Sequence, residues 1–135
     1  MSKLVLDVFT DYVWPWCYLS TVSIERLKQN YPVTIRWIHF PLHPDTPQEG
    51  KSLVELFAGR DLTPMRERMK ALMAEAGLEY GDRTHTFNSR HAQELGKWAD
   101  SKPGGEAIHD ELYRAYFVDN KNIGDIDELV VIAGA

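Results

Sequence analysis

Cysteine is nearly absent from this sequence of 135 residues, which contains only Cys17. One cysteine excludes a disulfide bond within the chain and a structural zinc site built from several cysteines. Long apolar runs are absent too, since no stretch approaches the roughly 20 residues that a membrane-spanning helix requires. Met1-Ser2-Lys3 leads directly into an apolar segment, which leaves no room for a signal peptide. We therefore expect a cytoplasmic protein that does not bind a membrane.

An excess of positive charge is also missing. The 15 Lys and Arg residues are outnumbered by 20 Asp and Glu residues, which gives a formal net charge of −5. Nucleic-acid binding depends on a basic patch that contacts phosphates, so nucleic acid is not an expected partner. The apolar fraction of 44% and the charged fraction of 26% are those of an ordinary globular protein. The length is sufficient for one hydrophobic core.

The first 19 residues contain the signals of a strand, a turn and the start of a helix. Leu4 to Phe9 is an almost unbroken apolar run, which is typical of a strand covered on both faces. Asp11 favours a turn, and Pro15 suits the first helical turn, where its missing N–H costs nothing. Cys17 then falls in that first turn, among unpaired N–H groups that carry partial positive charge. A thiolate is favoured there, so we predict a lowered pKa for Cys17.

The remainder of the sequence predicts one more strand and then helices. The helix that starts after Pro15 should end before Pro32, and Val33 to Phe40 alternates like a strand. A strand, a helix and a strand in this order predict a right-handed parallel unit. After a proline-rich connector, helices are expected at 51–58, 65–76, 88–101, 106–118 and 126–133, and residues 80–87 are expected to form a loop.

The turn itself reads Asp-Tyr-Val-Trp-Pro-Trp-Cys-Tyr over residues 11–18. It resembles the active-site turn of the thioredoxin-fold oxidoreductases of the DsbA family, most closely the FrnE-like branch, in which Asp-aromatic-Val-Cys-Pro-Trp-Cys-Tyr follows a buried strand. Trp14 stands at the position of the first, attacking cysteine, and Cys17 stands at that of the second, more buried one. The resemblance extends more weakly through Trp37 to Pro44 and through Asn88 to Ala133.

The resemblance implies an α/β fold made of a thioredoxin-like β-α-β segment (residues 1–45) and a large helical insertion domain (residues 46–135). The C-terminal half of the thioredoxin fold would be absent from this chain. A two-stranded sheet is marginally stable alone, and its first strand would expose an edge. We therefore expect either a truncated chain or a partner that covers the edge, such as the second copy in a homodimer.

The resemblance also implies a thiol–disulfide oxidoreductase. Because there is no second cysteine, the chain would act at most as a monothiol through Cys17, on a thiol or disulfide of a protein or small molecule. No cofactor or metal is implied, although glutathione could serve as co-substrate. The expected catalytic residues are Cys17, Trp14, Pro15 and Trp16. The expected substrate contacts are Asp11, Tyr12, Trp37, Phe40 and Pro41.

Two other functions stay open at this point. The kappa-class glutathione transferases and the 2-hydroxychromene-2-carboxylate isomerases resemble this family in fold and have serine at the first cysteine position. Trp14 has no hydroxyl with which to activate glutathione, which weakens that assignment. The second alternative is a binding module without catalysis, in which Cys17 is a small buried residue and the tryptophans cover the helix start or form a platform for substrate stacking.

The histidines give no clear site in the sequence. His39, His43 and Asp45 form a loose grouping, but Pro41 and Pro44 break the spacing that a metal site on a helix would need. Three further histidines have no useful mutual spacing, namely His85, His91 and His109.

Overall fold

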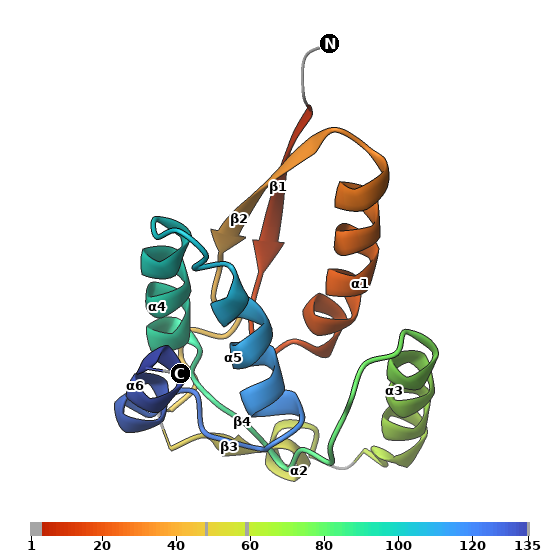
Figure 1. Cartoon of the computed structure of the whole chain (residues 1–135). Helices are drawn as coiled ribbons and strands as arrows, with labels where there is room; N and C mark the ends of the chain where they lie inside the picture. Colours follow the sequence, from red (N-terminus) through yellow and green to blue (C-terminus); the bar gives the residue numbers. More distant parts are fainter. Residues whose placement is uncertain (1–3, 48, 59, 135) are drawn as a thin grey trace.

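A computed structural model describes residues 4–47, 49–58 and 60–134 of the chain (Figure 1). Two strands flank a long helix at the start, and helices dominate the rest. The elements in chain order are β1 (Leu4–Thr10), α1 (Pro15–Asn30), β2 (Val33–His39), β3 (Lys51–Ser52), α2 (Leu53–Leu56), α3 (Thr63–Glu75), β4 (His85–Thr86), α4 (Arg90–Asp100), α5 (Ala107–Phe117) and α6 (Ile126–Gly134).

The β1–α1–β2 unit has the arrangement that the sequence predicts. β1 and β2 pair in parallel, from Leu4 opposite Val33 to Thr10 opposite His39. α1 connects them and lies beside the two strands in Figure 1. The prediction of a parallel strand–helix–strand unit is therefore confirmed. Because β1 and β2 end side by side, the turn before α1 lies next to the segment that follows β2.

The prediction that β1 is covered on both faces is wrong for this chain. Leu4 is 68% exposed and Phe9 is 64% exposed, whereas Thr10 at the end of the strand is buried. Within the described residues β1 pairs only with β2, and a sheet of two strands is too narrow to shield its own apolar side chains. Whether a second copy of the chain covers this edge stays a prediction.

Residues 51–58 and 80–87 also differ from expectation. Instead of a helix from 51 and a loop from 80, β3 and β4 form a short antiparallel pair with Lys51 opposite Thr86. The helix expected at 51–58 is limited to α2, Leu53–Leu56, and the Ser52 hydroxyl accepts the Val54 N–H at its start. The pairing joins two segments more than 30 residues apart, which local sequence patterns do not reveal.

The hydrophobic core centres on α5. The helix expected at 106–118 is confirmed by α5, and Leu112, Tyr116 and Phe117 on it are fully buried. Tyr18 of α1 stacks on Phe117 with ring centroids 5.2 Å apart and an interplanar angle of 3°. Met73 of α3 joins the same cluster. The core thus connects the thioredoxin-like segment to the helical segment, and full burial of each such side chain contributes about 1.5–3 kcal/mol.

The helix ends follow local rules. Gly77 after α3 has a φ of +77°, which is the left-handed conformation in which glycine commonly ends a helix. The side chains of Asn88 and Asp125 accept backbone N–H groups at the starts of α4 and α6. Among the described residues, no helix combines the length and the apolar character needed to cross a membrane.

Candidate active site

Asp11 fixes the turn that precedes α1. Its carboxylate accepts the backbone N–H of Val13 at 3.3 Å and that of Leu42 at 2.9 Å, and its carbonyl accepts the Trp14 N–H at 3.1 Å. The Asp11 side chain is only 1% exposed. The sequence suggests Asp11 as a substrate contact, whereas the structure places its carboxylate inside the framework that ties the turn to the segment after β2.

Cys17 lies in the first turn of α1, as predicted. The helix starts at Pro15, and the Cys17 N–H bonds the Trp14 carbonyl at 3.1 Å. The thiol is half-buried and packs against the hydrophobic core. Burial raises the pKa of the Cys17 thiol, although hydrogen bonds with the Asp11 backbone and the Thr10 side chain act in the opposite direction.

The prediction of a lowered Cys17 pKa is therefore wrong. A thiolate at this position loses water on the side facing the core. The negative charge of Asp11 nearby raises the pKa further. Desolvation of the sulfur is the largest cause of the raised pKa of Cys17.

The two tryptophans of the turn lie in different surroundings. Trp14 packs partly against the core and stacks on His43 from the loop after β2, with ring centroids 5.7 Å apart. This contact agrees with the covering role considered for the tryptophans. Trp16 is 50% exposed. Together with Pro15 it lines a cavity of about 120 Å³ between the turn and the start of α3.

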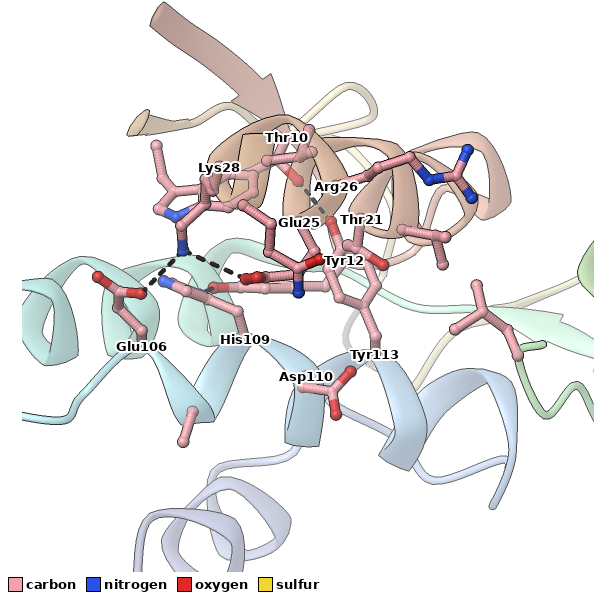
Figure 2. Close-up of a pocket in the computed structure, with 16 residues that line it drawn as sticks. Thr10, Tyr12, Thr21, Glu25, Arg26, Lys28, Glu106, His109, Asp110 and Tyr113 are labelled. Carbon is pink, nitrogen blue, oxygen red and sulfur yellow. Dashed lines mark hydrogen bonds and ion pairs between the residues drawn. The ribbon is translucent and has the colours of Figure 1, made fainter. Parts of the chain in front are cut away.

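A larger cavity of about 630 Å³ lies between α1 and α5 (Figure 2). Lys28 of α1 spans it and pairs with Glu25 at 3.2 Å and Glu106 at 3.5 Å. Tyr12 and Trp37, both expected substrate contacts, line this cavity. Pro15 and Trp16 line the smaller one, so these four expected site residues divide between two cavities.

The remaining expected contacts lie at the surface beside the sheet. Phe40 is half-exposed and meets Phe9 edge-to-face with centroids 6.2 Å apart. Pro41 is partly buried in the segment that Asp11 anchors through Leu42. Phe40 and Pro41 therefore lie directly after β2 and line neither of the two cavities.

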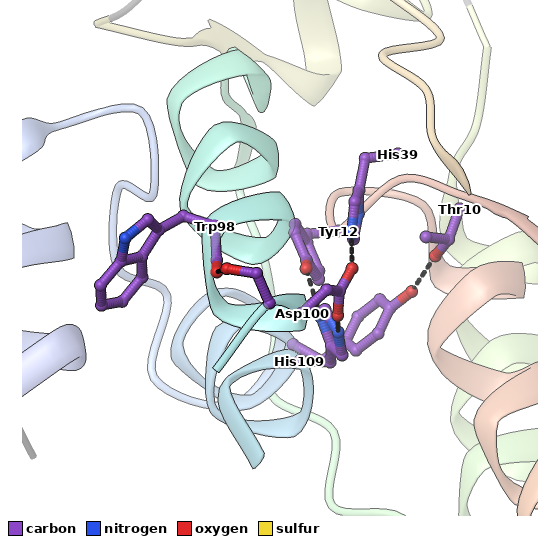
Figure 3. Close-up of polar contacts among 8 residues, drawn as sticks. Thr10, Tyr12, His39, Trp98, Asp100 and His109 are labelled. Carbon is purple, nitrogen blue, oxygen red and sulfur yellow. Dashed lines mark hydrogen bonds and ion pairs between the residues drawn. The ribbon is translucent and has the colours of Figure 1, made fainter. Parts of the chain in front are cut away.

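A chain of polar contacts beside the larger cavity, which the sequence did not predict, runs from the buried Tyr12 to the partly exposed Asp100 (Figure 3). The Tyr12 hydroxyl lies 2.5 Å from Nδ1 of His109, and Nε2 of His109 lies 2.7 Å from Oδ1 of Asp100. Oδ2 of Asp100 lies 2.9 Å from Nε2 of His39. Tyr12 is 1% exposed, and burial raises its pKa, so it stays a neutral phenol.

One sequence signal could have pointed to this chain. His109 lies on the same helical face as Leu112, Tyr113 and Tyr116, at spacings of three, four and seven residues. A titratable residue on a buried apolar face needs a polar partner. The partners lie as many as 97 positions away along the chain, so the sequence does not identify them.

Comparisons with known proteins give the family context of this geometry. The model of the DSBA-like thioredoxin domain matches residues 5–135. The uncharacterized protein YwbO of Bacillus subtilis is 25% identical over 134 residues, which cover 95% of this chain and 64% of that protein. The chain thus spans slightly less than two thirds of this curated relative.

Two solved structures share the fold. A probable DsbA oxidoreductase from Streptomyces coelicolor superposes with a TM-score of 0.87 at 23% identity, over 98% of this chain and 62% of that one. The cytosolic disulfide reductase DsbM from Pseudomonas aeruginosa, solved with GSH, superposes with a TM-score of 0.69 at 15% identity, over 97% of this chain and 64% of that one.

Proposed function

The chain belongs to the DSBA-like thioredoxin domain family, and from this premise we propose that it is a thiol–disulfide oxidoreductase of the FrnE-like DsbA type that reacts as a monothiol through Cys17. The observation that carries the proposal is the position of this one sulfur in the first turn of α1, directly after a strand and a turn. Trp14 fills the place of the attacking cysteine, which leaves Cys17 as the only thiol that can react.

The proposed reaction is thiol exchange with a glutathione mixed disulfide. The Cys17 thiolate attacks the glutathione sulfur, the substrate leaves as a thiolate, and Cys17 becomes glutathionylated. A second glutathione thiolate then attacks this adduct, releases glutathione disulfide and restores Cys17. The substrate sulfur is reduced and the second glutathione is oxidised, while the first glutathione enters and leaves as half of a disulfide, so the electrons balance without a second cysteine in the protein.

The surroundings of Cys17 determine how fast this exchange can be. Hydrogen bonds with the Asp11 backbone and the Thr10 side chain help to hold a sulfur anion, but burial keeps the thiol protonated at neutral pH. We therefore expect slow exchange at pH 7 that accelerates with rising pH. The small cavity beside Pro15 and Trp16 offers an apolar surface that continues into Met65 and is bordered by Arg66. A thiol that carries carboxylates, such as glutathione, suits this combination.

A cytoplasmic location belongs to the same proposal. A protein with a single cysteine gains no stability from an oxidising compartment, whereas glutathione keeps thiols reduced in the cytosol. The similar fold of DsbM, which is described as a cytosolic disulfide reductase, supports this assignment.

Mass spectrometry of the intact protein tests the proposal. The reduced protein is incubated with glutathione disulfide at pH 7, 8 and 9, and one glutathione per chain should attach increasingly fast. Cys17→Ser is the matched control and should take up none. The folded protein should also accelerate the reduction, by glutathione, of a mixed disulfide between glutathione and a small thiol.

Two outcomes would contradict the proposal, and each would favour one of the two other functions, a binding module or a glutathione-dependent transferase or isomerase. A folded protein that forms no adduct at any of these pH values would be a binding module without redox chemistry. Tight glutathione binding that leaves Cys17 unmodified, and that persists in Cys17→Ser, would favour the transferase or isomerase type of function.

A further inference from the structure

We propose that His39, Asp100 and His109 form a binding site for one divalent transition-metal ion of the zinc(II) class. The site is separate from Cys17 and does not depend on the redox function proposed above. The three residues come from the end of β2, the end of α4 and the start of α5, and Figure 3 shows the Asp100 carboxylate between the two imidazoles.

The geometry needs little adjustment to hold an ion. One nitrogen or oxygen from each of the three residues lies within 4.8 Å of the others. Zinc bonds of about 2.0–2.1 Å hold ligands roughly 3.3 Å apart, so the widest pair has to close by at most about 1.5 Å. The hydrogen-bonded His–Asp pairs, at 2.7 and 2.9 Å, have to open slightly. Asp100 is the last residue of α4, where a helix end adapts more easily than its middle. Its side chain is 26% exposed, which gives an ion a path from solvent.

The donors select a class of metal. Two imidazoles and one carboxylate suit zinc, cobalt and nickel, whereas calcium and magnesium prefer sites made of oxygen ligands. Three protein ligands also leave a coordination position open for water or a small anion. The His39 and His109 side chains are only 5% and 11% exposed, so the imidazoles form a fixed inner wall behind Asp100.

The groups around the cluster support a ligand role. Nδ1 of His109 is engaged by the Tyr12 hydroxyl, which orients the ring so that Nε2 faces Asp100. A metal-binding histidine usually has its second nitrogen held in this way. Nδ1 of His39 is buried and has no hydrogen-bond partner among the described residues. Nε2 of the same ring faces Asp100, so His39 is directed to the cluster through that nitrogen, and the ligand role is supported by the burial and orientation of the two rings.

The competing explanation is structural. A carboxylate that holds two histidines in place requires no metal, and both readings predict that the cluster contributes to folding. Metal binding itself therefore has to be measured, with readouts that a purely structural cluster would not affect.

The test is a zinc titration of the full chain against a chromophoric chelator, after treatment with EDTA and removal of the EDTA. One zinc per chain should bind, and cobalt should give the visible absorption of a site with nitrogen and oxygen ligands. Asp100→Asn should weaken binding by about 100-fold or more, and Tyr12→Phe, which changes only the partner of His109, by about 10-fold. His85→Gln, at an exposed histidine of β4, should bind as the unmodified protein does.

A second measurement needs no variant of the cluster. Because the His39 and His109 rings are too buried for a modifying reagent, nuclear magnetic resonance of the protein with 15N-labelled histidines follows their ring nitrogens directly. Zinc should shift the imidazole nitrogen signals of His39 and His109 and leave those of the exposed His85 unchanged. This readout decides the question even if Asp100→Asn does not fold, which circular dichroism will show.

The proposal is overturned if the wild type binds zinc no better than Asp100→Asn, or if zinc leaves the imidazole nitrogen signals of His39 and His109 unchanged. It is also overturned if Cys17→Ser abolishes binding, because the thiol would then be the ligand. Conversely, a Cys17→Ser variant that retains zinc binding and loses glutathionylation would show that the zinc site is independent of the thiol chemistry proposed for Cys17.

Discussion

The hydroxyl of Tyr12 occupies the space directly beside Gly96 in α4. A Cβ built on Gly96 would overlap that oxygen and would come within 3.2 Å of Cε1 of His39. Gly96 therefore lets the helix approach the turn before α1 closely enough for Tyr12 to reach Nδ1 of His109. The glycine is needed for its missing side chain, since its φ is not positive.

Gly96→Ala should destabilise the protein by about 1–3 kcal/mol, because the added methyl overpacks a buried contact. In an exposed helix the same change would stabilise by up to about 1 kcal/mol. The free energy of unfolding from urea titration measures the effect. Gly134→Ala is the matched control, since Gly134 is helical and nothing lies within 4 Å of an added Cβ. Equal stability of the Gly96→Ala and Gly134→Ala variants would contradict this account of the Gly96–Tyr12 contact.

Asp11→Asn should lower the free energy of unfolding by about 1–3 kcal/mol. The carboxylate accepts two backbone N–H groups, from Val13 and Leu42, whereas an amide can accept only with its oxygen and presents a donor to the other group. Urea unfolding measures the loss, and Asp119→Asn at an exposed position is the control. If Asp11→Asn unfolds like its control, the carboxylate is not what holds the turn to the segment after β2.

Alkylation of Cys17 by iodoacetamide should be slow at pH 7 and should continue to accelerate above pH 8.5, the ordinary value for a thiol. The reason is that burial raises the pKa of the thiol in the folded chain. A rate that levels off below pH 8 would show a lowered pKa, as the position at the start of α1 alone suggested.

The same shift has a consequence for stability. The unfolded chain releases the thiol proton at the ordinary pKa, while the folded chain retains it to higher pH. The resulting stabilisation is complete below the ordinary pKa and is lost as pH rises through the folded value. Cys17→Ala should therefore lose less stability between pH 8 and pH 10 than the wild type, as measured by urea unfolding at each pH.

Trp14→Cys should create a dithiol protein with measurable insulin-reducing activity. The new thiol would stand just before the first turn of α1, where unpaired N–H groups favour a thiolate, and Cys17 would serve as its partner. Mass spectrometry should show formation of an internal disulfide. Trp14→Ser removes the same packing without adding a thiol and should be inactive. A folded Trp14→Cys variant that forms no disulfide would mean that the turn lacks the active-site geometry of the family.

Features that depend on neighbouring residues could be predicted from the sequence. The apolar run before Asp11, the proline at the helix start and the break at Pro32 locate β1 and α1 correctly. The periodic apolar positions of α5 identify its buried face. Family membership follows from the same local pattern, because a strand, a turn and Pro-Trp-Cys-Tyr occur within a few consecutive residues.

The tertiary structure decided what depends on distant residues. The exposure of Leu4 and Phe9 depends on what packs against β1, and the raised pKa of Cys17 depends on how the core removes water from its sulfur. The chain of contacts through Tyr12, His109 and Asp100 joins residues up to 97 positions apart. Local sequence determines where a helix begins, because capping and proline act on neighbouring residues. Burial and long-range contacts determine the protonation of Cys17 and the hydrogen-bond partners of Tyr12 and His109.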